Sequence, residues 1–394
     1  MSRPRVLFAM ITVGQGHRAS AEAGAAWLER VYPGRFATEV VDFTAAVGDV
    51  RLDARHKAAW RGMLAAPWTA YLGQRLVDEV VPARISRGVQ GLLLRRHARH
   101  AAAWLAPRRD DLIVATHFFT GQALALARAR HGLRTPFVLV NPDLRDAHAL
   151  WAEPRADAFS VFSDAARADL VRHGVPAERI AVFDPLLRPG FDRPCPRDRR
   201  DAERERLGID ANAQVVLWSA GGEGRGGSLE RVVERLERRG TEVTLIALCG
   251  RNERLLEALR RRAARPSPLR LLPFGFRDDV ERLLCASDLF VGKAGPSSTA
   301  EALVMGVPVV HAGFAGANEK AVVDWVVNDG MGRFAPGPDR LAATIDELVR
   351  DPTAYQDLRA RVRAAAIRNG GAAWAHWLAD TFLTPAPAER EARA

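Results

Sequence analysis

The stretch GKAGPSSTAEALVMGVPVV, residues 292–310, combines a tight turn with clustered hydroxyl groups. It follows an apolar run, residues 288–291, that predicts a buried strand, and Gly295 with Pro296 then turns the chain into a helix. The polar side chains in the first turns of this helix are Ser297, Ser298, Thr299 and Glu301. Unpaired N–H groups at a helix N-terminus favour a phosphate, and hydroxyl groups add donors. The stretch therefore predicts a phosphate-binding turn.

Glu301 lies about one helical turn beyond the hydroxyl cluster. From that position a carboxylate can accept hydrogen bonds from a ribose diol, as acidic residues do in other nucleotide sites. The alternative is an ordinary helix, in which a serine caps the N-terminus and a glutamate stands in the first turn. The motif alone leaves both interpretations open.

Three further polar residues follow apolar runs in the N-terminal half. His17, in the turn VGQGHR, comes after the apolar run at residues 6–9, while His117 and Asp143 follow the runs at residues 112–116 and 137–141. Side chains in such positions reach the ligand crevice of an open α/β sheet. A histidine there can serve as a general base, because its unperturbed pKa lies near neutral pH. His17 can instead merely cap a helix or pack, and His117 and Asp143 can instead be ordinary polar residues of a loop.

Apolar runs of strand length alternate with helical patterns along the whole chain, which predicts an α/β fold with two mainly parallel, doubly wound sheets. The predicted strands of the first half are residues 6–9, 39–43, 112–116, 137–141, 158–162 and 180–183. Those of the second half are residues 215–219, 243–248, 269–272 and 289–291. A glycine-rich loop with Gly221, Gly222 and Glu223 follows the first strand of the second half and predicts another close approach to a phosphate or acceptor.

The chain of 394 residues exceeds the size of a single typical core, so two domains are expected. We place the first domain at residues 1–187 and the second at 201–360. The segment RPGFDRPCPRDRR, residues 188–200, has three prolines and no periodicity, and predicts the linker. Residues 361–394 form a helical tail that we expect to pack on the first domain, with Trp374 and Trp377 at packing positions.

Composition excludes several classes of protein. The chain is 48% hydrophobic and 26% charged, which is typical of a globular protein, and no apolar run approaches the roughly 18 residues that span a bilayer. Its three cysteines lack CxxC or histidine-linked spacing, so we expect neither a metal site nor disulfides, and a reducing cytosol fits best. The net charge of +10 by itself is weak evidence for nucleic-acid binding, because no aromatic-basic platform or helix-turn-helix accompanies it.

Seven segments in order resemble the monogalactosyldiacylglycerol synthases and the processive diacylglycerol glucosyltransferases, with MurG as a more distant relative. They are GQGHRASAEA, DLRDAHALW, LRPGF, GGEGRGG, CGRNERL, KAGPSSTAEA and VVNDGMGRF. The resemblance covers nearly the whole chain. It implies a GT-B fold, in which two Rossmann-like domains face each other across a cleft. It also implies an inverting transfer of a hexose from a UDP-sugar to the free hydroxyl of diacylglycerol, with no cofactor and no essential metal.

The resemblance also assigns roles to individual residues. It implies that His17 is the catalytic base, with Asp143 as its rival, and that His148 and Trp151 lie on the acceptor side. It implies that Glu301 binds the ribose, that Arg188 faces the phosphates, and that Phe276 lines the uracil pocket. The remaining positions implied for the nucleotide sugar are Gly221, Gly222, Glu223, Gly295, Ser297, Ser298, Thr299, Asn318 and Glu319.

Three departures from the family pattern affect these expectations. Gln15 replaces the middle glycine of the loop before His17, and Asp184-Pro185 stands where the family has Gly-Leu. The segment FAGANEKAV replaces one of the form AGQEAGN, so that Asn318 and Glu319 are the nearest match to the residues that contact the sugar. The choice between galactose and glucose therefore stays open.

The segment from Arg51 to Arg109 carries 12 Lys or Arg against 3 Asp or Glu, together with several tryptophans. One interpretation is a surface that meets anionic lipid while Trp60, Trp68 and Leu72 enter the membrane interface. The other is a solvated arginine face over a core of aromatic residues. We expect the membrane surface, because the implied acceptor lies in a bilayer, and place the protein in the cytoplasm on the inner face of the cell membrane.

Two other functions remain as alternatives. One is a GT-B transferase with a different lipid or hydrophobic acceptor. The other is a binder of nucleotide sugars without turnover, although the chain contains all four of His17, Asp143, Arg188 and Glu301.

Overall fold

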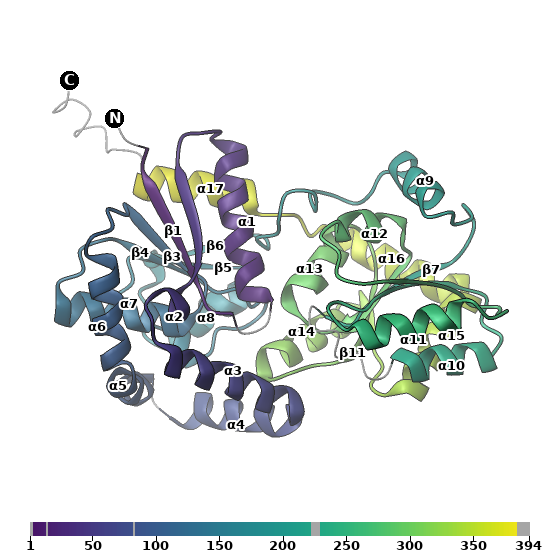
Figure 1. Ribbon diagram of the computed structural model, residues 1–394, viewed down its shortest axis with the longest axis horizontal. Helices are drawn as coiled ribbons and strands as arrows, with labels where there is room; N and C mark the ends of the chain where they lie inside the picture. The colour runs from purple at the N-terminus through teal and green to yellow at the C-terminus, as the bar shows by residue number, and fades with distance from the viewer. Residues whose placement is uncertain (1–2, 13–14, 82, 222–228, 384–394) are drawn as a thin grey trace. The chain divides into compact units, whose positions relative to one another are not determined.

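The computed structural model describes residues 3–12, 15–81, 83–221 and 229–383, and Figure 1 shows the order of their elements. Two compact units are present. The first unit contains Met1–Pro189, Ala315–Asn318 and Asn369–Ala394, while the second contains Gly190–Phe314 and Glu319–Arg368. The first unit is therefore built from both ends of the chain.

A six-stranded parallel sheet forms the centre of the first unit, in the order β2-β1-β3-β4-β5-β6. Its strands are β1 (Arg5–Met10), β2 (Ala37–Asp42), β3 (Leu112–Ala115), β4 (Phe137–Val140), β5 (Ala158–Val161) and β6 (Ile180–Val182). Its helices are α1 (Gly16–Val31), α2 (Phe43–Ala46), α3 (Val50–Ala65), α4 (Pro67–Val80), α5 (Ala83–Leu93), α6 (Arg95–Leu105), α7 (Phe118–His131), α8 (Asp164–Arg172) and α17 (Gly371–Leu378). Shorter turns are η1 (Ala149–Trp151), η2 (Ala177–Arg179) and η3 (Ala379–Leu383).

Both faces of this sheet are buried, as the apolar runs of its strands predict. On β1, Leu7 and Ala9 pack in one cluster with alternate residues of β3, β4 and β5. Val6 and Phe8 point to the opposite face and are buried as well. At Gly24 of α1, an added Cβ would lie 2.7 Å from Phe8, so the glycine permits the close approach of this helix.

The second unit has its own six-stranded parallel sheet, in the order β12-β11-β10-β7-β8-β9. Its strands are β7 (Val215–Ser219), β8 (Thr244–Leu248), β9 (Arg270–Phe274), β10 (Leu289–Lys293), β11 (Val309–Gly313) and β12 (Gly332–Phe334). Its helices are α9 (Arg197–Arg206), α10 (Leu229–Arg238), α11 (Glu253–Ala263), α12 (Val280–Ala286), α13 (Pro296–Val304), α14 (Ala317–Asn328, in this unit from its third residue), α15 (Pro338–Arg350) and α16 (Pro352–Ala365).

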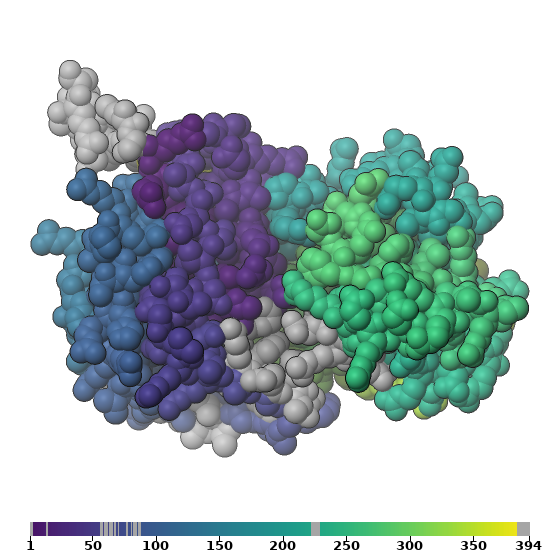
Figure 2. Space-filling model, viewed as in Figure 1, coloured from purple at the N-terminus to yellow at the C-terminus, as the bar shows by residue number. Residues whose placement is uncertain are grey.

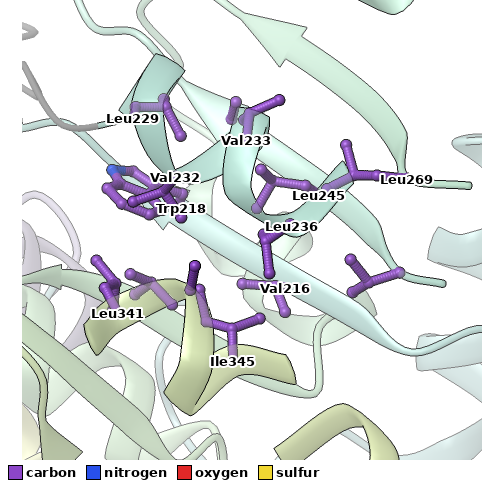
Figure 3. Packing of buried hydrophobic residues seen from close by; sticks show 14 of the residues in the cluster. Val216, Trp218, Leu229, Val232, Val233, Leu236, Leu245, Leu269, Leu341 and Ile345 are labelled. Carbon is purple, nitrogen blue, oxygen red and sulfur yellow. The ribbon is translucent and has the colours of Figure 1, made fainter. Parts of the chain in front are cut away.

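Figure 3 shows the core over one face of this second sheet. Side chains of α10 and α15 pack against Val216 and Trp218 of β7 and against Leu245 of β8. The other residues of β7, Val215 and Leu217, are also buried. Both units thus have the doubly wound architecture that the sequence predicts.

All ten predicted strands are present within a few residues of their expected bounds. The two strands that the sequence analysis did not define are β11 and β12, and β12 has only three residues. The linker prediction is partly wrong, because α9 already begins at Arg197 and the second unit already begins at Gly190. Pro196 is the N-cap residue of α9, so a proline that indicates a break in fact marks a helix start.

The predicted tail, residues 361–394, is divided between the units: residues 361–368, with the end of α16, belong to the second unit and residues 369–383 to the first, while residues 384–394 lie outside the described residues. Tyr355 and Leu358 of α16 are buried in the second unit. Helix α17 packs on α1, and its Trp374 is fully buried beside Phe8, with ring centroids 6.3 Å apart. Trp377 lies against Phe183, at a centroid distance of 5.3 Å.

The expectation that the cysteines are unpaired is wrong for two of them. The structure joins Cys195 to Cys285, whose Cα atoms are 5.3 Å apart, while Cys249 is free and buried. The pair is separated by 90 residues and is brought together because the segment before α9 returns to α12. Sequence spacing does not reveal such a long-range contact.

We expect one titratable thiol in the denatured, unreduced protein and three after reduction, because only Cys249 is free in the structure. Counting thiols with a chromogenic reagent in denaturant, with and without a reductant, measures this. A Cys195→Ser variant serves as the control and should show two thiols in both conditions. Three thiols in the unreduced parent protein would contradict the pairing.

The basic segment folds into helices α3 to α6, and Figure 2 shows part of it, in indigo and blue, at the surface of the first unit. Trp68 and Leu72 of α4 are 55% and 62% exposed. The side chain of Trp60 lies outside the described part of the structure. Among the described residues, no helix is both long and apolar enough to cross a bilayer.

Candidate functional sites

The first unit has a topological switch point between β1 and β3. From β1 the chain continues to β2 on one side, whereas β3, β4, β5 and β6 follow one another on the other side. Ligands of open α/β sheets bind at the carboxyl ends of strands beside such a point. His17 follows β1 and His117 follows β3, so both lie at this edge.

His17 is held by two hydrogen bonds to Thr116, the residue directly after β3. The Nδ1 atom of His17 lies 2.5 Å from the carbonyl oxygen of Thr116, and the hydroxyl of Thr116 donates to the carbonyl of His17 at 2.9 Å. Because a carbonyl only accepts, Nδ1 carries the proton, and the Nε2 atom of the neutral ring keeps its lone pair. Burial lowers the pKa of His17 to about 4. The ring is therefore a neutral acceptor at physiological pH.

His117 lies beside His17, with ring centroids 4.5 Å apart. It is the N-cap residue of α7, where its Nδ1 accepts a hydrogen bond from the Phe119 amide at 3.1 Å. The side chain is 4% exposed. His117 thus caps α7, a role that was not predicted for it, and its ring lies beside that of His17.

The segment after β4 brings the three acceptor-side candidates to the same edge. Trp151 is buried, and its ring lies 6.4 Å from His17 and 6.3 Å from His148. Burial lowers the pKa of His148 to about 4, which keeps this ring neutral. Burial raises the pKa of Asp143 to about 6. Its carboxylate is therefore ionised at neutral pH and becomes protonated below about pH 6.

The second unit has its own switch point, between β7 and β10. From β7 the chain continues to β8 and β9, whereas β10 continues to β11 and β12 on the opposite side. The glycine-rich loop follows β7, and α13 follows β10, so the two predicted phosphate-binding segments share this edge. Gly221 has a φ of +76°, a conformation that favours glycine. Gly222 and Glu223 lie outside the described residues.

The turn into α13 has the predicted strand-turn-helix form. Gly295 is the N-cap residue, and Ser298 donates its hydroxyl to the Gly295 carbonyl at 3.2 Å. Ser297, Ser298 and Glu301 are partly exposed. Thr299 differs from the prediction, because its side chain is fully buried and its hydroxyl does not reach the helix surface. Helical periodicity turns this position toward the core.

Two charged residues and a histidine gather at the ends of β10 and β11. Lys293 forms an ion pair with Glu319, whose side chain is buried. His311 of β11 is fully buried, and burial together with the charge of Lys293 lowers its pKa to about 4. Glu319 was expected to contact the sugar, but neither its pairing with Lys293 nor the buried His311 was predicted. A histidine directly after the apolar run VPVV was the available signal.

The other predicted nucleotide residues occupy varied positions. Phe276 follows β9, is 54% exposed, and has the Arg251 guanidinium 4.6 Å from its ring centroid. Arg188 is in the first unit, where its carbonyl accepts a hydrogen bond from Asn369. Asn318 is the second residue of α14.

Among the described residues, no group of three His, Cys, Asp or Glu side chains is arranged to hold a metal ion.

Comparisons with known proteins give a consistent family likeness. Residues 95–185, which include His117, Asp143, His148 and Trp151, match the family described as monogalactosyldiacylglycerol (MGDG) synthase. The chain is 26% identical to the chloroplastic monogalactosyldiacylglycerol synthase 1 of Arabidopsis thaliana over 87% of its length. It is also 26% identical to the enzyme of Spinacia oleracea over 88% of its length. The chain covers only 64% and 66% of these two longer proteins.

Solved structures share the fold of the whole chain. The MurG protein of Acinetobacter baumannii aligns over 96% of this chain and all of its own, with a TM-score of 0.61 and 13% identity. The Anabaena protein HepE, in complex with UDP and glucose, aligns over 97% of this chain and all of its own, with a TM-score of 0.52 and 16% identity. The chain therefore has the GT-B fold of glycosyltransferases, and in sequence it is similar to the MGDG synthases.

We expect the imidazole of His17 to titrate near pH 4 instead of near 6.5, because burial disfavours its charged form. The unfolded chain then binds more protons than the folded chain between these values, so this residue lowers stability as the pH falls through that window. Histidine NMR of the parent protein, with a His17→Gln variant to assign the signal, measures the titration. A midpoint near 6.5 would show that the ring is not held neutral.

Proposed function

We propose that the protein is an inverting glycosyltransferase that moves galactose or glucose from a UDP-sugar to the free hydroxyl of a diacylglycerol. Its sequence likeness to the MGDG synthases extends over 87% of the chain and carries the proposal. The GT-B fold alone does not distinguish transferases, since a UDP-GlcNAc 2-epimerase from Neisseria meningitidis also aligns with a TM-score of 0.56. At the strand edge His17 offers a neutral nitrogen that can accept the hydroxyl proton in such a transfer, although its pKa of about 4 makes it a weaker base than Asp143.

In this reaction the acceptor oxygen attacks the anomeric carbon while the bond from that carbon to the diphosphate breaks. The Nε2 atom of His17 takes the proton of the acceptor hydroxyl, and UDP leaves with the bonding electron pair. Attack from the face opposite to UDP inverts the anomeric centre. Asp143 is the second candidate base, because its pKa of about 6 leaves it ionised at neutral pH.

The second unit supplies the groups that stabilise the leaving UDP. The N-terminus of α13, with Ser297 and Ser298, offers N–H and hydroxyl donors to the diphosphate. We assign Glu301 to the ribose and Phe276 to the uracil, as the resemblance implies. The resemblance adds Arg188, which belongs to the first unit, to the groups at the phosphates, and with these donors for the developing charge we propose no essential metal.

Sugar recognition involves the start of α14. Asn318 and Glu319 stand where the family has residues that contact sugar hydroxyls. The buried carboxylate of Glu319 is ion-paired to Lys293, which fixes its position. The specificity of the protein for one hexose then depends on the fixed position of the Glu319 carboxylate.

We place the lipid acceptor at a membrane surface that binds the helical segment α3 to α6. Trp68 and Leu72 of α4 and Ile85, Val89 and Leu92 of α5 are exposed apolar side chains among many arginines. Such a surface fits an anionic membrane, in which apolar side chains enter the interface and arginines meet the head groups. The cytoplasmic face of the cell membrane is the expected location.

Mass spectrometry of the products tests the proposed reaction. Purified protein is incubated with diacylglycerol liposomes and a panel of UDP-sugars and other nucleotide sugars. A hexosyl-diacylglycerol from one UDP-sugar is the expected product. Release of UDP without a glycolipid would support an enzyme that acts on UDP-sugars but contradict diacylglycerol as its acceptor. Tight UDP binding without any turnover would contradict catalysis and indicate a binding protein.

A Glu301→Ala substitution should raise the KM for the UDP-sugar by roughly 10- to 100-fold, which is the loss expected for a charge-assisted hydrogen bond to the ribose. The kcat should change much less, because the lost contact is made equally before and during the reaction. Steady-state kinetics with varied donor measures both. Glu347→Ala, at an exposed position of α15, is the control, and a Glu301 variant with unchanged donor KM would remove this residue from the ribose site.

The double substitution Trp68→Ala and Leu72→Ala should reduce flotation with anionic liposomes, since it removes apolar area that enters the interface. Binding should also fall when the anionic lipid is replaced by a neutral one. Val182→Ala with Val327→Ala removes exposed apolar side chains elsewhere and serves as the control. Binding that is indifferent to both lipid charge and the α4 substitutions would contradict a membrane surface at this position.

A further inference from the structure

The acceptor-side segment, residues 146–151, is fixed by side chains from three helices, α4, α7 and α8, and by Asn141 directly after β4. Each of these side chains bonds to the backbone of the segment. The Asn141 amide donates to the Asp146 carbonyl (2.8 Å), Asp169 accepts from the Ala147 amide (3.1 Å), Asp78 accepts from the Ala149 amide (2.6 Å), and Gln122 donates to the Leu150 carbonyl (2.8 Å). His148 therefore stands between two backbone amides that are each bound by a carboxylate.

Asp78 differs from the other three because it lies on α4, outside the sheet and its adjoining helices α7 and α8. Its carboxylate also lies 3.4 Å from Nε2 of His173 and 3.8 Å from Nη2 of Arg172. Burial raises the pKa of Asp78, but His173 and the Ala149 amide outweigh it and keep the net pKa below the ordinary value. The short contact to the Ala149 amide is thus made by a charged acceptor, the stronger kind of hydrogen bond.

Loss of this carboxylate would leave the Ala149 amide without its acceptor in a place where Ala149 is only 3% exposed. A buried N–H group without an acceptor costs more than the hydrogen bond itself contributed. The segment is expected to relieve that cost by moving toward water. Such a movement displaces His148, which directly precedes Ala149, and Trp151, which follows it by two residues.

The same helix carries two of the exposed apolar side chains of the membrane surface, Trp68 and Leu72. Leu72 is six residues before Asp78, which corresponds to about 9 Å along the helix axis. The helix thus presents Trp68 and Leu72 to solvent at its beginning and binds the acceptor-side segment near its end.

We propose that Asp78 is a positioning residue that holds His148 and Trp151 for the lipid acceptor and couples their segment to the membrane-facing helix α4. This inference depends on the proposed function, in which the lipid binds beside these two residues. It assigns Asp78 no contact with the substrate. Asp169 has the same role through the Ala147 amide.

The test compares Asp78→Ala and Asp78→Asn with Glu79→Gln, all in the full-length protein. Glu79 is the adjacent carboxylate on the same helix, is exposed, and pairs with Arg75 one turn away. Hydrogen exchange with mass spectrometry measures protection of residues 144–152. Kinetics on diacylglycerol liposomes measure the acceptor KM, and equilibrium binding measures the Kd for UDP.

We expect Asp78→Ala to speed exchange in this peptide and to raise the acceptor KM about tenfold, with an unchanged Kd for UDP. Asp78→Asn keeps an acceptor oxygen and should restore part of the protection, while Glu79→Gln should match the parent. Unchanged exchange in Asp78→Ala would overturn the positioning role, whether or not the protein makes glycolipid. Equal losses in UDP binding and acceptor KM would indicate general destabilisation and would also overturn it.

If the parent makes no glycolipid, the proposed function fails and the coupling to a lipid acceptor fails with it. The exchange measurement then still decides whether Asp78 positions the segment. If the parent is active and Asp78→Ala has the parent's acceptor KM, the proposed function stands and the coupling is rejected.

Discussion

Burial of both faces of each parallel sheet is the constraint on which the rest of the structure depends. In the first unit Leu7 and Phe8 point to opposite faces, and both are inaccessible to solvent. Ligands of such a sheet bind at the carboxyl ends of its strands, beside a switch point. His17 in the first unit and Gly295 in the second accordingly follow β1 and β10.

The same burial sets the protonation of the groups at this edge. His17 and His148 are neutral because the surrounding protein disfavours an imidazolium ion, whereas Asp143 holds its proton more tightly than a solvated carboxyl. A hydrogen bond to the Thr116 carbonyl then decides which nitrogen of His17 is free. The neutral state of His17 and the choice of its free nitrogen therefore follow from packing and one backbone contact.

The sequence predicts what is encoded locally. Apolar runs located ten strands, and glycine next to proline located the turn into α13, because these signals act over a few residues. Long-range contacts were not predictable in this way: the return of Cys195 to Cys285, the pairing of Lys293 with Glu319, and the contact of Asp78 with Ala149. The burial of Thr299 was missed because a motif gives residue types but not the side of the helix that faces the core. The family likeness supplied roles for single residues, which periodicity alone does not give.

The first unit is completed by the two ends of the chain. Helix α17 packs on α1, Trp374 fills a buried place beside Phe8, and the backbone at Gly371 lies too close to Trp27 for any larger residue. During synthesis this place stays empty while the entire second unit emerges from the ribosome. Most of the first unit is translated before the second unit, but its packing is completed only when α17 has been made. A chain that ends before α17 therefore lacks part of the first unit.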